Sequence, residues 1–275
     1  VQMGLPAIEW WERHFDKVER QGTLVVSQPR DAAELKRFAR RTEGHVWLDD
    51  TQISELETDI SGRFTAALFF AEEAHLNPRE AMVALHQRLV ELDVSVRYGV
   101  SMSTQSSTSG TVVDCRGLAA KDKLDDLRGV RGEMLLLRSN EINLSRTVRM
   151  LHPRFPVYIV PHGAGLYMVG ATMIESDSYA SMSVRSAMEL LGAAVALHPA
   201  FGEAEIVEMG VGVRPAFPDN IPDVRRDDNV FYVNGLYRHG YLLAPAMAMK
   251  VANIITGVGH NSKVQDEDFR QWKAS

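Results

Sequence analysis

Cysteine is almost absent from this sequence, since Cys115 is the only one among 275 residues. One cysteine excludes an internal disulfide framework and is typical of a protein of the reducing cytoplasm. We expect Cys115 to be a small core residue rather than a reactive thiol. No apolar run approaches the ~18 residues of a membrane-spanning helix, and the chain does not open like a signal peptide. The sequence therefore predicts a cytoplasmic protein with no membrane partner.

The signatures of several common protein classes are also missing. The formal net charge is −6 and no basic block occurs, which argues against nucleic acid as a partner. Neither the G-x-S-x-G elbow of hydrolases nor a Walker loop is present. The nine histidines are dispersed and no C-x-x-C or H-E-x-x-H occurs, so we expect no metal site. The hydrophobic and charged fractions, 45% and 24%, are those of a globular protein.

Strands and helices alternate in the first hundred residues. Short β-prone runs predict strands at 22–27, 46–48 and 66–70. Apolar residues at helical spacing predict helices at 8–18, 31–41, 50–56 and 78–92. Asn77 and Pro78 fit the N-cap and first position of the last of these helices.

The next stretch predicts two strands joined by a polar connection. The strands are expected at 94–100 and 111–115, and the Ser/Thr-rich residues 101–110 between them are expected to form a loop or a hairpin connection. Further strands are predicted at 130–137, 157–160, 166–169 and 206–213. These runs, with the helices, predict an α/β fold that also contains an antiparallel sheet.

A helix is predicted at 183–196, because apolar residues recur there at helical spacing. Its inward face is expected to consist of Val184, Ala187, Met188, Leu191 and Val195.

The end of the chain predicts a strand, a glycine turn and a buried helix. Residues 230–233 form a β-prone apolar run, Gly235 and Gly240 bracket the turn, and 242–255 are apolar almost all round. A helix N-terminus directs backbone N–H groups and a positive dipole end at whatever fills such a turn. An ordinary strand–helix junction without a ligand is the alternative. The polar residues in and beside the turn favour a ligand.

Three motifs carry a resemblance to a known family. GVRPAFPDNIP at 212–222 resembles a G-x-R-P-x-x-P-D-x-x-P element, and GLYRHGYLLAP at 235–245 resembles a closing G-x-x-R-x-G-x-x-L-A-P element. YIVPHGAGLYMVGATM at 158–173 is similar to a third, hairpin element. All three are typical of FAD-dependent amine, D-amino-acid and glycine oxidases, and they occur here in the family's order. The likeness covers most of residues 1–258 and is strongest toward the glycine oxidases of thiamine biosynthesis.

The resemblance implies a substrate site. Arg214 matches an arginine that clasps the substrate carboxylate, for which a guanidinium fork is better suited than lysine. Tyr158 matches a tyrosine that hydrogen-bonds the same carboxylate, Met173 an apolar wall, and Arg238 a second arginine at the edge of the flavin. Surface ion pairs for the arginines and core packing for Tyr158 and Met173 are the alternatives. No acid/base pair is expected.

The resemblance also implies contacts to a non-covalent FAD. Gly117 would lie beside the cofactor, as would Val100, for which core packing is the alternative. The remaining residues are those of the closing turn, namely Gly235, Arg238, His239, Gly240, Tyr241 and Leu242. Some sarcosine oxidases tether their flavin through a cysteine, but Cys115 does not match that position, so no covalent flavin is expected.

One element of the family pattern has no counterpart here. No G-x-G-x-x-G turn occurs, although in the family it binds the pyrophosphate of the dinucleotide. Residue 1 matches a family position beyond that fingerprint. We therefore expect these 275 residues alone to hold FAD weakly and not to turn over. Unpaired sheet edges should then be covered by an oligomer or by a rearranged domain.

The function implied by the resemblance is oxidation of a small amino acid, most simply glycine, to its imine. A hydride would pass to the flavin, and oxygen would reoxidise the flavin and yield peroxide. The alternatives are a sarcosine, D-amino-acid or other amine oxidase, and a non-catalytic fragment without FAD. The predicted domains are a substrate domain at 1–74 and 127–228, the remainder of an FAD domain at 75–126 and 229–258, and a tail at 259–275.

Overall fold

The computed structural model describes residues 2–101 and 110–257, which form two compact units. The first unit takes its described residues from Val1–Ala7, Tyr98–Leu127 and Pro215–Ser275. The second comprises Ile8–Arg97 and Arg128–Arg214. Residues 75–97 thus cluster with the second unit and 215–228 with the first. The predicted tail, and the predicted loop at 101–110 apart from its two ends, lie outside the described residues.

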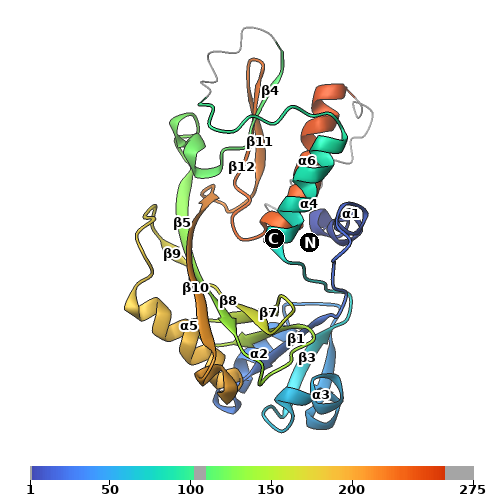
Figure 1. Ribbon diagram of the computed structural model, residues 1–275, viewed down its shortest axis with the longest axis vertical. Coiled ribbons are helices and arrows are strands. Elements are labelled where there is room, and N and C mark those ends of the chain that lie inside the picture. The colour runs from blue at the N-terminus through green and yellow to red at the C-terminus, as the bar shows by residue number, and fades with distance from the viewer. Residues whose placement is uncertain (1, 102–109, 258–275) are drawn as a thin grey trace. The chain divides into compact units, whose positions relative to one another are not determined.

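A mixed nine-stranded sheet organises the second unit, and Figure 1 shows its long strands β5 and β10 side by side. Its main path runs β10-β5-β8-β7-β6-β1-β3-β2, with β9 paired to β5. The β1–β6 pairing is parallel, whereas the β1–β3, β2–β3, β5–β8, β5–β9, β6–β7 and β7–β8 pairings are antiparallel. The bounds are β1 (Thr23–Ser27), β2 (Val46–Asp49), β3 (Ala66–Phe70), β5 (Arg128–Arg138), β6 (Thr147–Leu151), β7 (Val157–Pro161), β8 (Leu166–Gly170), β9 (Ile174–Glu175) and β10 (Glu205–Ala216).

Helices cover both faces of this sheet, which is why β1 is buried along its whole length. Leu24 and Val26 join the main core, which includes residues of α3 and α5, whereas Val25 joins a second cluster with Leu35 of α2. The helices of this unit are α1 (Ala7–His14, beginning at the end of the first unit), α2 (Ala32–Ala39), α3 (Asp50–Leu56), α4 (Pro78–Glu91) and α5 (Val184–Leu197).

The predicted inward face of α5 was wrong except for Leu191, which packs against the main core. The buried side chains are those of Ser186, Leu190, Ala193, Ala194 and Leu197, on the face that packs against β5, β7 and β8. Val184 and Met188 are instead 77% and 68% exposed. Apolar residues occupy most of the circumference of this helix, so periodicity alone selected the wrong side.

The first unit is built on a small sheet in the order β11-β12-β4. β11 (Asp223–Asp227) pairs antiparallel with β12 (Val230–Asn234), and β12 pairs parallel with β4 (Val112–Asp114). Phe231 and Val233 pack against Met247 and Val251 of α6 (Gly240–Thr256), while Val230 and Tyr232 pack into a separate cluster. The predicted strand, glycine turn and helix are therefore present.

Three predictions in this unit and at its border were wrong. Residues 94–100 form no strand, because no strand in the described part of the chain pairs with their alternating valines, and they are exposed. Cys115 is exposed rather than in the core, and the pKa of its thiol is raised by desolvation and by Asp114. The helix α6 is apolar but packs along one side only, so that Leu242 and Met249 are 44% and 42% exposed.

Candidate functional site

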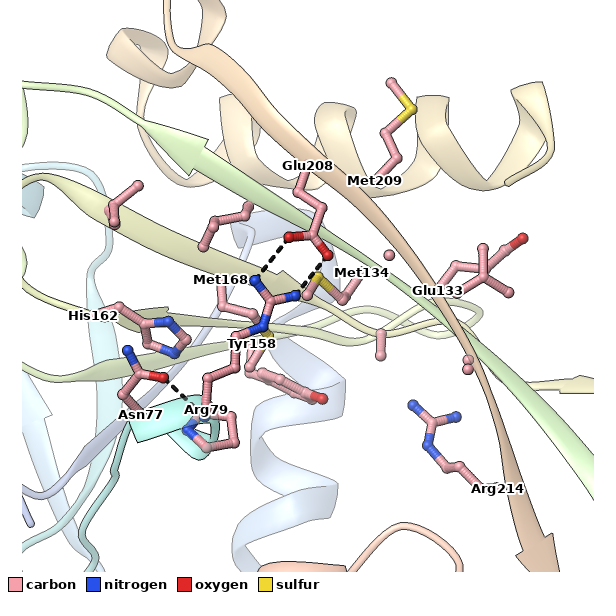
Figure 2. Close-up of a pocket in the computed structure, with 18 of the residues that line it drawn as sticks. Asn77, Arg79, Glu133, Met134, Tyr158, His162, Met168, Glu208, Met209 and Arg214 are labelled. Carbon is pink, nitrogen blue, oxygen red and sulfur yellow. Dashed lines mark hydrogen bonds and ion pairs between the residues drawn. The ribbon is translucent and has the colours of Figure 1, made fainter. Parts of the chain in front are cut away.

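A cavity of about 720 Å³ lies in the second unit. It is lined by residues of β5, β7, β8 and β10, by the start of α4, and by the segments beside them. Arg214 and Tyr158 both line it, and Figure 2 shows the phenol of Tyr158 directed toward the side on which the guanidinium of Arg214 lies. The structure thus brings together the two residues expected to bind the carboxylate.

Arg214 lies near the end of β10, and neighbouring elements fix its side chain. Its Nη1 donates to the carbonyl oxygen of Thr172 at 3.2 Å. Its guanidinium lies directly over Gly132 of β5, where a Cβ would overlap it. Only glycine leaves room for the guanidinium in this position.

Tyr158 is packed against a second glycine. A Cβ on Gly170, the residue opposite Tyr158 in the β7–β8 register, would stand 3.2 Å from the ring and its hydroxyl. Because the neighbouring strand carries no side chain at this point, the phenol can lie along the cavity wall.

An ion pair occupies another part of the lining. Arg79, in the first turn of α4, donates to both carboxylate oxygens of Glu208 on β10, at 2.8 and 2.6 Å (Figure 2). α4 is oriented by the predicted cap, since the side chain of Asn77 accepts from the backbone N–H of Arg79 at 3.1 Å. His162 lies nearby, and burial, together with His75 and Arg79, lowers the pKa of its imidazole.

A buried acid lies on β5 beside Gly132. Glu133 is fully buried and pairs with Arg131, whose Nη2 lies 2.6 Å from Oε1. Burial by itself would raise the pKa of Glu133, but hydrogen bonds from Ser186, Arg131 and Thr172 outweigh it and lower the pKa. The group is therefore a carboxylate at neutral pH. Among the described residues, no group of three or more His, Cys, Asp or Glu is placed to hold a metal ion.

The other residues expected at the substrate or cofactor are distributed differently. Met173 is 49% exposed and is not part of the cavity lining. All of those expected at FAD belong to the first unit, namely Val100, Gly117, Gly235, Arg238, His239, Gly240, Tyr241 and Leu242. Val100 is 55% exposed, which excludes core packing for it.

The closing turn of the first unit is held by backbone hydrogen bonds. The N–H of Tyr237 donates to the carbonyl of Pro215 at 3.1 Å, and that of His239 to Leu236 at 3.0 Å. His239 is the N-cap residue of α6, and Gly240 begins the helix; apart from its chain neighbours and the backbone of its own helix, no described atom lies within 4 Å of where its Cβ would be. The positive end of the α6 dipole is therefore approachable at Gly240.

Sequence reasoning missed Asn234, which joins two of the expected glycines. Its side chain, 1% exposed, donates to the carbonyl of Gly117 at 2.8 Å and accepts from the N–H of Gly235 at 2.8 Å. Gly117 and Gly235 have φ values of +62° and +79°, which suit glycine. The position of Asn234, between an apolar β-prone run and a glycine, is the one sequence signal that could have indicated this residue. Gly132, Glu133 and Thr172 were missed as well.

Comparison with known proteins places these features in a family. Residues 1–254 match the family model described as DAO, FAD dependent oxidoreductase. A Rhizobium etli protein, provisionally named as the thiamine biosynthesis oxidoreductase ThiO, is 53% identical over 253 residues, which are 92% of this chain and 77% of that protein. A glycine oxidase of Bacillus licheniformis is 26% identical over 77% of this chain, which spans only 62% of that relative.

Solved structures show the same fold. Glycine oxidase from Geobacillus kaustophilus superimposes with a TM-score of 0.78 at 20% identity, over 96% of this chain and 80% of that one. Iminodiacetate oxidase from Chelativorans sp. BNC1 gives a TM-score of 0.77 at 17% identity, over 94% and 79%. None of the helices in the described part of the chain is long and apolar enough to cross a membrane. By its sequence and its fold, the chain belongs to the DAO family of FAD-dependent oxidoreductases.

Proposed function

We propose that this protein takes part in the oxidation of glycine by FAD, and that the cavity containing Arg214 and Tyr158 binds the carboxylate of the amino acid. The observation that carries the proposal is that these two side chains line one cavity, where the guanidinium of Arg214 packs against Gly132. The names of relatives, a thiamine biosynthesis oxidoreductase and a glycine oxidase, support the substrate.

The chemistry assigned to this chain is positioning. A guanidinium fork and a phenol hydroxyl are suited to the two oxygens of a carboxylate, and a charge-assisted pair of this kind fixes orientation as well as affinity. FAD, when bound, would accept the hydride removed from the substrate. The carbonyl of Thr172 limits the orientations of the guanidinium before the substrate arrives.

The described residues fit one edge of FAD. The start of α6, open at Gly240, offers backbone N–H groups and a positive dipole end to an electron-rich ring edge. Arg238, His239, Tyr241 and Leu242 would surround that edge, together with Gly117 and Gly235, which are both hydrogen-bonded to Asn234. Val100 is proposed as a further neighbour, and Met173 as an apolar contact of the substrate. The binding is proposed to be non-covalent.

Turnover with glycine tests the proposal. Purified protein would be supplied with FAD and glycine under air, and glyoxylate, ammonia and hydrogen peroxide would be measured. We expect the three in equal amounts, since the imine hydrolyses after two electrons have passed to oxygen. Faster turnover of sarcosine or a D-amino acid than of glycine would assign the substrate differently. Absence of peroxide with every amine, in protein shown to contain FAD, would contradict an oxidase.

A further inference from the structure

A buried ion pair lies on β5 beside the candidate substrate cavity. Glu133 is 0% and Arg131 6% exposed, and the Nε and Nη2 atoms of Arg131 donate to Oε1 of Glu133 at 3.0 and 2.6 Å. Removing two charges from water is costly unless hydrogen bonds satisfy both groups. The contacts that satisfy this pair therefore indicate what it holds in place.

Arg131 fastens the segment that leads into α5. Its Nη1 donates to the carbonyl of Ser178 at 2.8 Å, and its Nη2 donates to that of Ser181 at 2.9 Å. The guanidinium thus joins β5 to a stretch of backbone that follows β9.

Glu133 fastens a second segment, the one between β8 and β9. The Thr172 hydroxyl donates to Oε2 of Glu133 at 3.1 Å and accepts from the Glu133 N–H at 2.9 Å. The Thr172 N–H donates to the Glu133 carbonyl at 3.1 Å. Thr172 is therefore held to Glu133 by both its side chain and its backbone.

Thr172 connects this buried pair to the substrate arginine. Its carbonyl oxygen accepts from Nη1 of Arg214 at 3.2 Å. Successive residues of a strand point to opposite faces, and Gly132, between Arg131 and Glu133, faces the guanidinium of Arg214. The pair on one face of β5 thereby reaches the arginine on the other face through Thr172.

We propose that Glu133 and Thr172 are positioning residues for carboxylate binding, and that they set the orientation of the Arg214 guanidinium. The inference rests on the proposed function, in which Arg214 binds the substrate carboxylate. An acceptor held rigidly at one corner of the guanidinium restricts the orientations that its planar fork can take. In this role, both residues act through Arg214.

Two substitutions of one residue separate positioning from bulk stability. Thr172→Val removes the hydroxyl at nearly constant volume, and Thr172→Ser keeps it. Binding of glycine and of acetate, a carboxylate without an amino group, would be measured by isothermal titration calorimetry beside thermal unfolding. We expect the Kd of both ligands to rise about threefold to tenfold in Thr172→Val, roughly the effect of one lost hydrogen bond, and to stay unchanged in Thr172→Ser.

A matched control is available on the same sheet. Thr147 of β6 is half-buried and is not part of the cavity lining. Thr147→Val makes the same chemical change and should leave both Kd values unchanged. If Thr172→Val does not fold, Glu133→Gln replaces it, since the amide keeps the shape of the carboxylate but donates where the carboxylate accepts. That variant should weaken acetate and glycine binding alike.

The outcomes separate this inference from the function on which it rests. If Arg214→Lys weakens acetate binding and Thr172→Val does not, the positioning role is overturned while the carboxylate site stands. If neither substitution affects binding, Arg214 does not bind the carboxylate, and the positioning role is overturned with it. A lower Tm in Thr172→Val with unchanged Kd values would show that the network serves only stability, and would also overturn the inference.

Discussion

At the scale of single residues, Arg214 is the side chain on which the proposed function most depends. Arg214→Lys keeps the charge but loses the planar fork. In flavin-loaded, full-length protein we expect the KM for glycine to rise, with a loss of about 1.5–3 kcal/mol in binding, the usual worth of a hydrogen bond to a charged group. Steady-state kinetics with glycine, beside thermal unfolding, would measure both effects. The Tm should change little.

Arg225 provides the control for that substitution. It also makes a bidentate pair, with Asp126 at 2.7 and 2.8 Å, but at a partly exposed site in the first unit. Arg225→Lys should leave the KM unchanged. An unchanged KM in Arg214→Lys as well would refute the carboxylate role.

Gly132 is the second residue with a specific expectation. Gly132→Ala places a methyl group where the guanidinium of Arg214 now lies, and the flexible end of that side chain can move aside. We expect a folded protein whose KM for glycine is raised about tenfold, equivalent to ~1.4 kcal/mol. Gly192→Ala, on α5 with no atom near its Cβ position, should leave the KM unchanged. Unaltered kinetics in Gly132→Ala would mean that the contact with Gly132 does not position the guanidinium of Arg214.

Burial of histidines makes stability depend on pH, and His75 and His162 are the two that lie close together. Burial lowers the pKa of His75 and of His162 below the ordinary value of 6.5. The unfolded chain therefore binds protons at a higher pH than the folded chain, and stability falls as the pH drops through that ordinary value. Nearby carboxylates of Glu19 and Glu80 oppose this effect without cancelling it.

The histidine effect is measured by thermal unfolding. We expect the Tm to fall between about pH 7.5 and about pH 5.5, a range above the ordinary pKa of carboxylates. The Tm of the double variant His75→Asn/His162→Asn should fall less over this range, while the Tm of His86→Asn should fall as much as that of the parent protein. Equal slopes in the double variant and the parent would assign the dependence to other groups.

At the scale of elements, the start of α6 carries the expected contact to FAD. Gly240→Val fills the open side of the helix N-terminus and should lower both the flavin content and the reduction potential of bound flavin. A helix N-terminus acts as roughly +0.5 charge and stabilises a nearby negative charge by about 0.3–2 kcal/mol. Absorbance spectra and a redox titration would measure these quantities.

A second valine on the same helix separates local crowding from loss of helix stability. Ala248 is exposed on α6, and Ala248→Val adds the same kind of side chain away from the N-terminus. It should change neither flavin content nor potential. A normal potential and flavin content in Gly240→Val would remove the proposed contact.

The strands that sequence patterns predicted best are those with continuous β-prone runs. β3 lies at 66–70 and β12 at 230–234, as their runs of buried residues indicated. β6 and β11 were missed, because Arg149 interrupts one strand and the other, DVRRD, is mostly charged. Pairing with neighbours rather than composition makes them strands.

The candidate site was predictable only in part. Arg214 and Tyr158 stand in recognisable motifs, and they line one cavity. The link from Glu133 to Arg214 was not visible, because it joins residues 39 and 42 positions apart through Thr172. Such contacts exist only after β5, β8 and β10 have come together, and no local spacing encodes them.

At the scale of the whole molecule, the open question is how tightly these 275 residues hold FAD. The sequence contains no G-x-G-x-x-G turn to receive the pyrophosphate. We expect equilibrium dialysis against FAD to show weak binding, with a colourless protein after purification. Stoichiometric binding at micromolar or tighter affinity, by a chain of confirmed length, would refute this. Sedimentation of the same sample would test the predicted oligomer.

The alternation of β5 has a consequence for how this protein can diverge. Position 132 faces the substrate arginine, and its neighbours 131 and 133 face a buried network that reaches the same arginine. Natural variation in substrate preference can therefore enter through substitutions at Arg131 and Thr172, which are not part of the cavity lining. In a directed-evolution search for new amine substrates, we expect selected changes around Thr172 and Arg131, while glycine persists at 132.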